Sequence, residues 1–501
     1  MDKRVFSKRL AVSFALGVLL LYGVVSGAED GSPPFQAVIP TTGTAAESTA
    51  GRELERNIST EAPEKSLSEQ IQGDSTDFQR SIDELKAQID VLHDSLEKER
   101  KVPQSNKKFS AKVGGLLEMD AIAIDQSREN QERYGDIDND YVVRDLRFWV
   151  KGEGYDNLDY EVALGYAGSL SFKNVVITAK NLPILDTARI GYFKVESGMN
   201  YAQIVYDYTF TDCDSIENTF RGSRRLGIAS IHYGQNKNIR LFTGIFTDQN
   251  LSIGDGKHAN ESNDNPGVIL NTRLTAIPIY TECAEGEVAE VFHLGGGFRW
   301  VDVGRDRETG QIQETTLKAS PTDWLPDMTP LIVGKIATDS YAVTNVEAGW
   351  QRGRLGLIGE GHFGTYDGYD NAYSVSTTGR FLLTPGAYQK YNKANGCFSG
   401  IAIPANMRFI DCEKWTCLEG GGVWEVAAQW AWTDLDMLRD GLGTNFYGRM
   451  HQYTVALNWY WNPQTRWGLD WIYAKPISGT GGADETASSL NTLACQVRIC
   501  F

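Results

Sequence analysis

Polar and apolar residues alternate in short stretches over the last four fifths of the chain, from residue 109 to residue 501. Between 453 and 461, one face carries Tyr453, Val455, Leu457, Trp459 and Trp461, and the other carries Thr454, Ala456, Asn458 and Tyr460. A period of two residues is that of a β-strand, whose successive side chains point to opposite faces. Residues 108–501 are therefore predicted to form an all-β domain.

Many of the apolar faces begin or end in Trp or Tyr, as in strands that cross the two edges of a bilayer. The turns also alternate in length: short ones lie near 155–157, 234–236, 351–353 and 462–464, and long polar ones near 125–140, 196–220, 248–266, 302–340 and 476–488. If each strand, together with its share of the connections, takes about 24 residues, the roughly 390 residues of this region form about 16 strands. This pattern predicts an antiparallel transmembrane β-barrel of about 16 strands with a water-filled lumen.

The N-terminus has the layout of a secretory signal peptide over residues 1–28. A basic start is followed by an apolar run from Leu10 to Val25, and Ser26 and Ala28 supply small residues before the expected cleavage point. The run of roughly 16 residues is shorter than the ~20 that a membrane-spanning helix needs. Residues 29–74 are rich in Ser, Thr, Ala, Glu and Pro and are expected to form a flexible polar linker.

Residues 75–102 carry a heptad seam that predicts a short coiled-coil helix. Its apolar positions are Phe78, Ile82, Leu85, Ile89, Leu92 and Leu96. The alternative is one amphipathic helix that lies on its own protein. Ile and Leu at the seam favour two strands.

The chain carries a formal net charge of −17, and loss of 1–28, which sum to +3, leaves −20. Nucleic acid is an unfavourable partner for so acidic a protein. Residues that would serve as catalytic or metal-binding motifs are missing from the sequence: His residues lack H-x-x-x-H spacing and Cys residues lack C-x-x-C spacing. No catalytic residue, metal or cofactor is expected, and the protein is predicted not to be an enzyme.

Several stretches, in this order, resemble the phosphate-selective porin O and P family: RDLRFWVKG at 144–152, DYEV at 159–162, ARIGYFK at 188–194, RRLGI at 224–228, GVWEVAA at 422–428 and LNWYWNP at 457–463. The resemblance covers about 108–501. It implies a 16-stranded trimeric porin in the outer membrane, with its N-terminal segment in the periplasm. Some members of the family prefer phosphate.

An anion path needs basic side chains that face the lumen, because Arg and Lys bind oxyanions. The candidates on or beside the matched strands are Arg144, Arg147, Lys151, Lys194, Arg221, Arg224 and Arg225. The third loop, which the resemblance places inside the lumen, supplies the constriction candidates Tyr201, Tyr206, Asp207, Tyr208, Asp212 and Asp214. Because this loop is acidic, it opposes a phosphate preference. In the alternative, the arginines pair with lumen carboxylates such as Glu161, Glu347, Glu360 and Glu425.

These observations favour passive diffusion of small hydrophilic solutes or ions through a homotrimeric barrel embedded in outer-membrane lipid. One alternative is a structural anchor whose N-terminal segment tethers the cell wall. Another is a secreted, soluble β-protein that binds carbohydrate through exposed Trp side chains. The barrel interpretation requires the apolar faces, Trp included, to point outward to lipid.

Overall fold

The computed structural model describes residues 109–155, 157–167, 169–212, 219–248, 264–282, 288–306, 309–322, 331–411, 413–435, 448–478 and 486–501. The predicted signal peptide (1–28), linker (29–74) and coiled-coil helix (75–102), together with Asp214, lie outside these residues. No helix in the described part of the chain is long and apolar enough to span a membrane.

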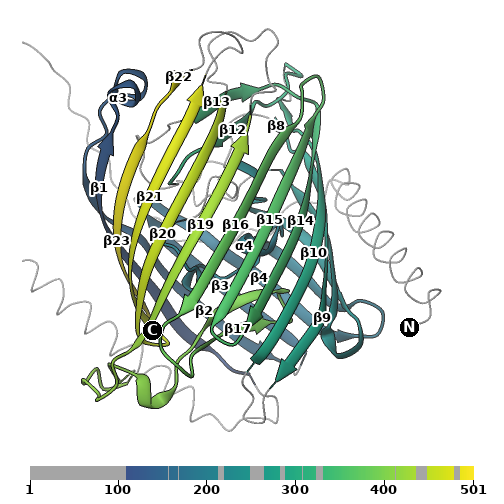
Figure 1. Ribbon diagram of the computed structural model, residues 1–501. Coiled ribbons are helices and arrows are strands. Elements are labelled where there is room, and N and C mark those ends of the chain that lie inside the picture. Colours follow the sequence, from purple (N-terminus) through teal and green to yellow (C-terminus); the bar gives the residue numbers. More distant parts are fainter. Residues whose placement is uncertain are drawn as a thin grey trace, which may run out of the picture. The chain divides into compact units, whose positions relative to one another are not determined.

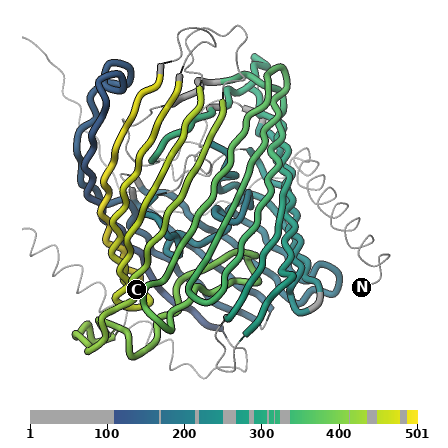
Figure 2. Tube along the Cα trace, in the orientation of Figure 1, coloured from purple at the N-terminus to yellow at the C-terminus, as the bar shows by residue number. Residues whose placement is uncertain are grey.

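The predicted barrel is confirmed as a closed, antiparallel barrel of 16 strands (Figure 1). In order around the wall these are β1 (Lys112–Gln126), β2 (Asp140–Gly154), β3 (Leu158–Ala167), β4 (Ser169–Leu182), β5 (Asp186–Lys194), β6 (Arg224–Tyr233), β7 (Ile239–Thr247), β9 (Val268–Glu282), β10 (Val288–Asp302), β14 (Ser340–Arg352), β15 (Leu355–Tyr366), β16 (Ala372–Leu382), β19 (Val423–Asp434), β20 (Gly448–Asn462), β21 (Thr465–Ser478) and β23 (Leu490–Cys500). The first strand pairs with the last, from Leu116 opposite Cys500 to Gln126 opposite Leu490. This pairing leaves no open sheet edge (Figure 2).

The connections contain the remaining elements. These are α3 (Arg128–Tyr134), α4 (Met199–Ala202), η1 (Val205–Asp207), η2 (Gln235–Lys237), η3 (Ala405–Met407), and the short strands β8 (Asp264–Asn265), β11 (Arg305–Asp306), β12 (Thr315–Ala319), β13 (Leu331–Ile336), β17 (Tyr388–Asn392), β18 (Cys397–Ala402) and β22 (Thr486–Ala487).

The two faces of the wall have the expected polarity. On β21, Trp471 is 46% exposed on the outer face, whereas its neighbour Asp470 is fully buried on the inner face. On β20, Leu457 is 39% exposed and Asn458 is fully buried. The Trp side chains of these strands therefore face outward and do not pack inside a sandwich, which agrees with an apolar surface for lipid and a polar interior.

The predicted short turns lie at one end of the barrel and the predicted long loops at the other, but the separation is incomplete. The connections β3–β4 and β15–β16, at the long-loop end, are short. The connection between β16 and β19 lies at the short-turn end but spans residues 383–422. It contains β17 and β18, which form a hairpin. The sequence had not indicated this long insertion, because its turn-rich residues resemble those of an ordinary surface loop.

Two segments enter the barrel and fill much of its interior. One is the connection 195–223 between β5 and β6, with α4 and η1; the other is the β17–β18 hairpin. Met199 of α4 and Phe398 of β18 belong to one buried apolar cluster with Ile358 on the wall. A second apolar cluster, at the long-loop end, includes Leu317 and Ile336 of the β12–β13 pair. The remaining open space lies to one side.

Candidate permeation path

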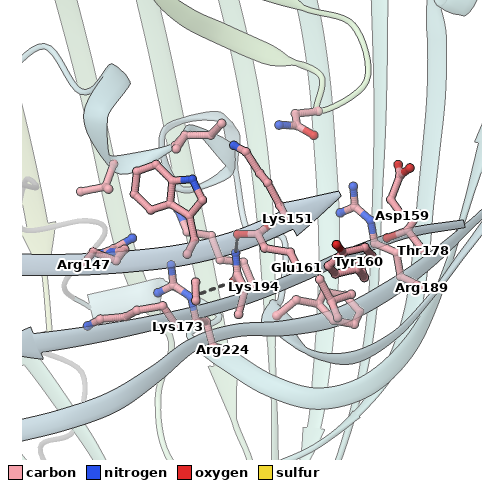
Figure 3. A pocket seen from close by; sticks show the side chains of 18 of the residues that line it. Arg147, Lys151, Asp159, Tyr160, Glu161, Lys173, Thr178, Arg189, Lys194 and Arg224 are labelled. Atoms are coloured by element: carbon pink, nitrogen blue, oxygen red, sulfur yellow. Dashed lines mark hydrogen bonds between the residues drawn. The ribbon is translucent and has the colours of Figure 1, made fainter. Parts of the chain in front are cut away.

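A cavity of about 690 Å³ lies inside the barrel against the inner faces of β2, β3, β4 and β5. Residues 201–206 of the inward connection line its other side, and Asn395 at the tip of the β17–β18 hairpin also borders it. The cavity is thus enclosed by the wall and by both inward segments (Figure 3).

Basic side chains predominate along this cavity. Four carboxylates border it, Glu153, Asp159, Glu161 and Glu196, against seven cations: Lys112, Arg147, Lys151, Lys173, Arg189, Lys194 and Arg224. This local excess is opposite in sign to the net charge of −17 of the chain. Arg147, Lys173 and Arg224 gather at one end, and Arg189 lies beside Tyr160 and Asp159 at the other (Figure 3).

Strand alternation places Arg147, Trp149 and Lys151 of β2 on the cavity side. Their neighbours Phe148 and Val150 are exposed on the outer face. Because residues two apart on a strand share a face, one strand presents two cations with an aromatic ring between them. The Lys151 ammonium lies 5.4 Å from the centre of the Trp149 ring.

Lys173 reaches the cavity through a β-bulge. Between β3 and β4, Ala163 pairs with Asn174 while the next residue, Leu164, pairs with Phe172, so Lys173 is the extra residue. Both Lys173 and its neighbour Asn174 consequently line the cavity, which regular alternation forbids. A Cβ at Gly165 would lie 2.2 Å from Cε of Lys173, so this glycine makes room for the lysine stem.

The neutral side chain of Asn174 links Arg224 of the basic cluster to Glu161. Arg224 donates from Nε to the Asn174 side-chain oxygen at 3.3 Å, and Asn174 donates from Nδ2 to Glu161 at 2.8 Å. Among the described residues, no carboxylate lies at salt-bridge distance from Lys151, Lys173, Arg189 or Arg224. These four positive charges are therefore available to a solute.

Three of the four carboxylates have cationic partners outside the cavity. Glu196 accepts from Arg240 at 2.6 Å and 2.7 Å and from Arg273 at 3.3 Å. Lys180 lies 2.7 Å from Asp159 and 3.6 Å from Glu153. Because these partners neutralise much of the acidic lining, the field in the cavity is set chiefly by its cations.

Backbone groups of the 195–223 connection bind to the wall at several points. The Lys194 ammonium donates to the carbonyls of Tyr201 and Gln203, both at 2.8 Å. Glu360 accepts from the backbone N–H groups of Met199 and Asn200, both at 3.1 Å. Further along, Asp470 accepts from the Thr211 N–H at 2.6 Å.

Two acidic constriction candidates of this connection, Asp207 and Asp212, turn away from the cavity. Asp212 pairs with Arg144 at 2.7 Å, and the Gly400 backbone N–H of the hairpin donates to Asp207. Burial raises the pKa of Asp207 to about 6, although the nearby cations Lys390 and Arg498 and the Gly400 hydrogen bond act in the opposite direction. Neither Asp207 nor Asp212 borders the cavity, whereas Tyr201 and Tyr206 do.

The hairpin tip is held by guanidinium groups of the opposite wall. Arg240 on β7 donates from Nε to the Ala394 carbonyl at 2.6 Å. Arg273 on β9 donates to the carbonyls of Asn395 at 3.0 Å and Gly396 at 2.7 Å. The hairpin therefore spans the lumen from β16 and β19 to β7 and β9, and it separates the cavity from the far wall.

Of the seven basic candidates predicted from the sequence, Arg147, Lys151, Lys194 and Arg224 border the cavity, and Arg144, Arg221 and Arg225 do not. Arg144 instead joins the constriction segment to the wall through Asp212. Arg147 pairs with Asp145, and the glutamates Glu347 and Glu425 pair with Arg273 and Arg380, which were not candidates.

Of the constriction candidates, Tyr201 and Tyr206 line the cavity, and Tyr208 provides a backbone carbonyl that accepts from Arg498 at 3.1 Å. Sequence reasoning missed Lys112, Lys173 and Arg189. Arg189 lies within a stretch that carries the family resemblance and could have been found there by alternation. Among the described residues, no three His, Cys, Asp or Glu side chains form a group that could hold a metal ion.

A family model described as phosphate-selective porin O and P matches residues 113–498. No curated protein sequence matches the chain.

Similar solved structures include an anion-selective porin from Comamonas acidovorans, 11% identical over 79% of this chain and 100% of that chain, with a TM-score of 0.45. Others are the outer membrane channel DcaP of Acinetobacter baumannii (11% identity, 78% and 97% coverage, TM-score 0.44) and OmpT, an outer membrane protein of Vibrio cholerae (9% identity, 80% and 100% coverage, TM-score 0.44).

Proposed function

Because this chain belongs to the phosphate-selective porin O and P family, we propose that its barrel passes small hydrophilic anions, phosphate and other oxyanions among them, along β2–β5. The protein is an outer-membrane porin. Its closed 16-strand barrel is a passive channel through which small solutes diffuse down their gradients. The proposal concerns the charge of the solutes that the channel prefers and the route that they take through the barrel.

The observation that carries the proposal is the basic lining of the cavity, with seven cations against four carboxylates. Low-dielectric walls concentrate the field of such groups in a narrow space and raise the local concentration of ions of opposite charge. Arg147, Arg189 and Arg224 add planar guanidinium groups, which can donate two parallel hydrogen bonds to an oxyanion. The acidic constriction segment does not oppose this field, because Asp207 and Asp212 lie away from the cavity.

The decisive measurement is ion selectivity in planar bilayers. Refolded protein should give stepwise currents, and a KCl gradient should give a reversal potential of the sign expected for chloride preference. Lys173→Glu changes the local charge by two units where no described carboxylate neutralises it, and it should abolish or reverse that preference. Lys237→Glu, in the short turn η2 away from the cavity, makes the same charge change and should leave the potential unaltered.

Cation preference in the wild-type protein would refute the anion assignment. Equal effects of Lys173→Glu and Lys237→Glu would refute the route, because both variants alter the total charge equally. A folded, heat-modifiable sample without conductance would argue against an open channel altogether.

For the remainder of the chain we propose cleavage after Ala28, a periplasmic N-terminal segment with a linker and coiled-coil helix, and assembly as a homotrimer in outer-membrane lipid. The heptad seam over 75–102 supports self-association of that segment. Deletion of residues 29–101 should leave the single-channel conductance unchanged, because the described residues that border the cavity all belong to the barrel domain. Loss of cell-wall association in the same variant would favour an additional tethering role.

A further inference from the structure

The cavity carries aromatic rings as well as cations. Phe193, Trp149 and Tyr160 of the wall and Tyr201 and Tyr206 of the inward segment all border it. From this combination we infer that the channel favours organic anions that join a carboxylate to a flat aromatic ring over inorganic or aliphatic anions of equal charge. The inference rests on the proposed anion path and names the solute class that this path recognises.

Trp149 occupies an inward position of the barrel wall, whereas Trp424 and Trp471 are exposed on the outer face. Its indole lies against the backbone of β1, because a Cβ at Gly114 would be 2.6 Å from Nε1 of Trp149. The ring therefore lies close to the wall, and lipid contact does not explain it. The sequence already showed this aromatic residue on the charged face of β2.

Tyr206 extends this aromatic surface from the opposite side of the cavity. Its ring centre lies 6.3 Å from that of Trp149, at an interplanar angle of 29°. Tyr201 lies on the same inward segment, and the Lys194 ammonium is 4.6 Å from its ring centre. Rings from the wall and from the inward segment thus border the cavity together with the cations.

These rings are not required to hold the inward segment in place. Glu360 and Asp470 already anchor its backbone, and Arg466 donates to the Thr209 carbonyl at 2.8 Å. Such charge-assisted hydrogen bonds are roughly twice as strong as hydrogen bonds between neutral groups. Trp149 and Tyr206, which border the cavity, can therefore contact a solute there.

The cavity has the size and composition of a site for a small organic acid. Its volume of about 690 Å³ lies within the range of roughly 300–1,000 Å³ found for small-molecule sites. A carboxylate can approach Lys173 and Arg224, while its ring packs on Trp149 and Tyr206. Aromatic packing contributes enough beyond area burial to favour such a ring about three- to tenfold.

The test compares how three anions of equal charge block the chloride current of single channels: benzoate, cyclohexanecarboxylate and acetate. Benzoate should block at a concentration about three- to tenfold lower than cyclohexanecarboxylate, and acetate should be weakest. Trp149→Leu should remove the advantage of benzoate. Trp471→Leu, which removes a lipid-facing indole from β21, is the matched control and should retain it.

Tyr206→Leu tests the same surface from the inward segment, so that a folding failure of Trp149→Leu does not leave the inference undecided. Equal block by benzoate and cyclohexanecarboxylate in the wild-type channel would overturn the inference. That result would leave the anion path intact if the reversal potential still shows chloride preference. Loss of chloride preference itself would instead overturn the proposed function.

Discussion

Basic side chains have different surroundings in the two halves of the barrel interior. Along β2–β5, cations face an open cavity, and four of them have no described carboxylate at salt-bridge distance. Across the lumen, Arg240, Arg273, Glu196, Glu347 and His293 form a buried network. There Arg273 lies 2.7 Å from Glu347, and His293 lies 3.1 Å from the same oxygen.

The difference follows from what occupies the lumen. The β17–β18 hairpin fills the space beside β7, β9 and β10, and a charge enclosed by protein must be paired because its desolvation is costly. Beside β2–β5, the cavity leaves room for water, which can solvate an unpaired cation. Where the chain fills the barrel, charged side chains pair with one another and hold the hairpin in place. Where the barrel is open, the cations can act on passing ions.

The comparison predicts its largest effect in the buried network. Glu347→Leu removes the carboxylate of His293 and leaves Arg273 with Glu196 alone, and should lower the free energy of unfolding by about 3–5 kcal/mol. Glu161→Leu, in the open cavity, removes one hydrogen bond from Asn174 and should cost no more than about 1 kcal/mol. Urea titrations in lipid vesicles, followed by Trp fluorescence, measure both. Similar losses in the two variants would contradict the distinction.

Shortening the β17–β18 hairpin should open the part of the lumen beside β7, β9 and β10. Replacing residues 389–401 by a short Gly-Ser link removes the tip that Arg240 and Arg273 bind. Single-channel conductance should rise several-fold, and anion preference should weaken because ions in a wider path pass farther from the cations of β2–β5. Shortening 413–419, in the same connection but outside the lumen, serves as the control. Unchanged conductance in the hairpin variant would show that the hairpin does not restrict flow.

A smaller effect, on the reversal potential, is expected when a larger side chain is placed beside the β-bulge at Lys173. Gly165→Val places a side chain where the Lys173 stem now lies, so the ammonium must move, while the charge of the protein is unchanged. The reversal potential should shift part of the way toward that of Lys173→Glu. Gly359→Val on β15 is the control, because the nearest atoms lie 3.8 Å from its Cβ position. Equal potentials in the two valine variants would argue that the position of Lys173 is unimportant.

The smallest predicted effect is a pH dependence of stability at the contact between the two inward segments. Because burial raises the pKa of Asp207 from 3.8 to about 6, the folded protein binds this proton more tightly than the unfolded chain. The resulting stabilisation is complete below pH 4 and is lost as the pH rises through 6. Asp207→Asn should flatten the unfolding free energy over pH 4–6 relative to wild type. An identical pH profile in both proteins would exclude Asp207 as its source.

The sequence alone determined the architecture of the wall. Alternation is a local property, and a one-residue shift would turn every apolar side chain of a strand toward water, so residues such as Leu457 and Asn458 have only one favourable placement. The same reasoning correctly brought Arg147 and Lys151 to the inner face. It also identified the long connection after Lys194, whose Tyr201 and Tyr206 line the cavity.

Only the tertiary structure decided which charges remain available. Lys173 faces inward because a bulge interrupts the alternation, and Arg144 is neutralised by Asp212, 68 positions further along the chain. The hairpin enters the lumen because guanidinium groups on β7 and β9 bind carbonyls more than 120 residues away. Pairing between distant residues depends on which segments fill the same space, and a local period of two contains no information about that.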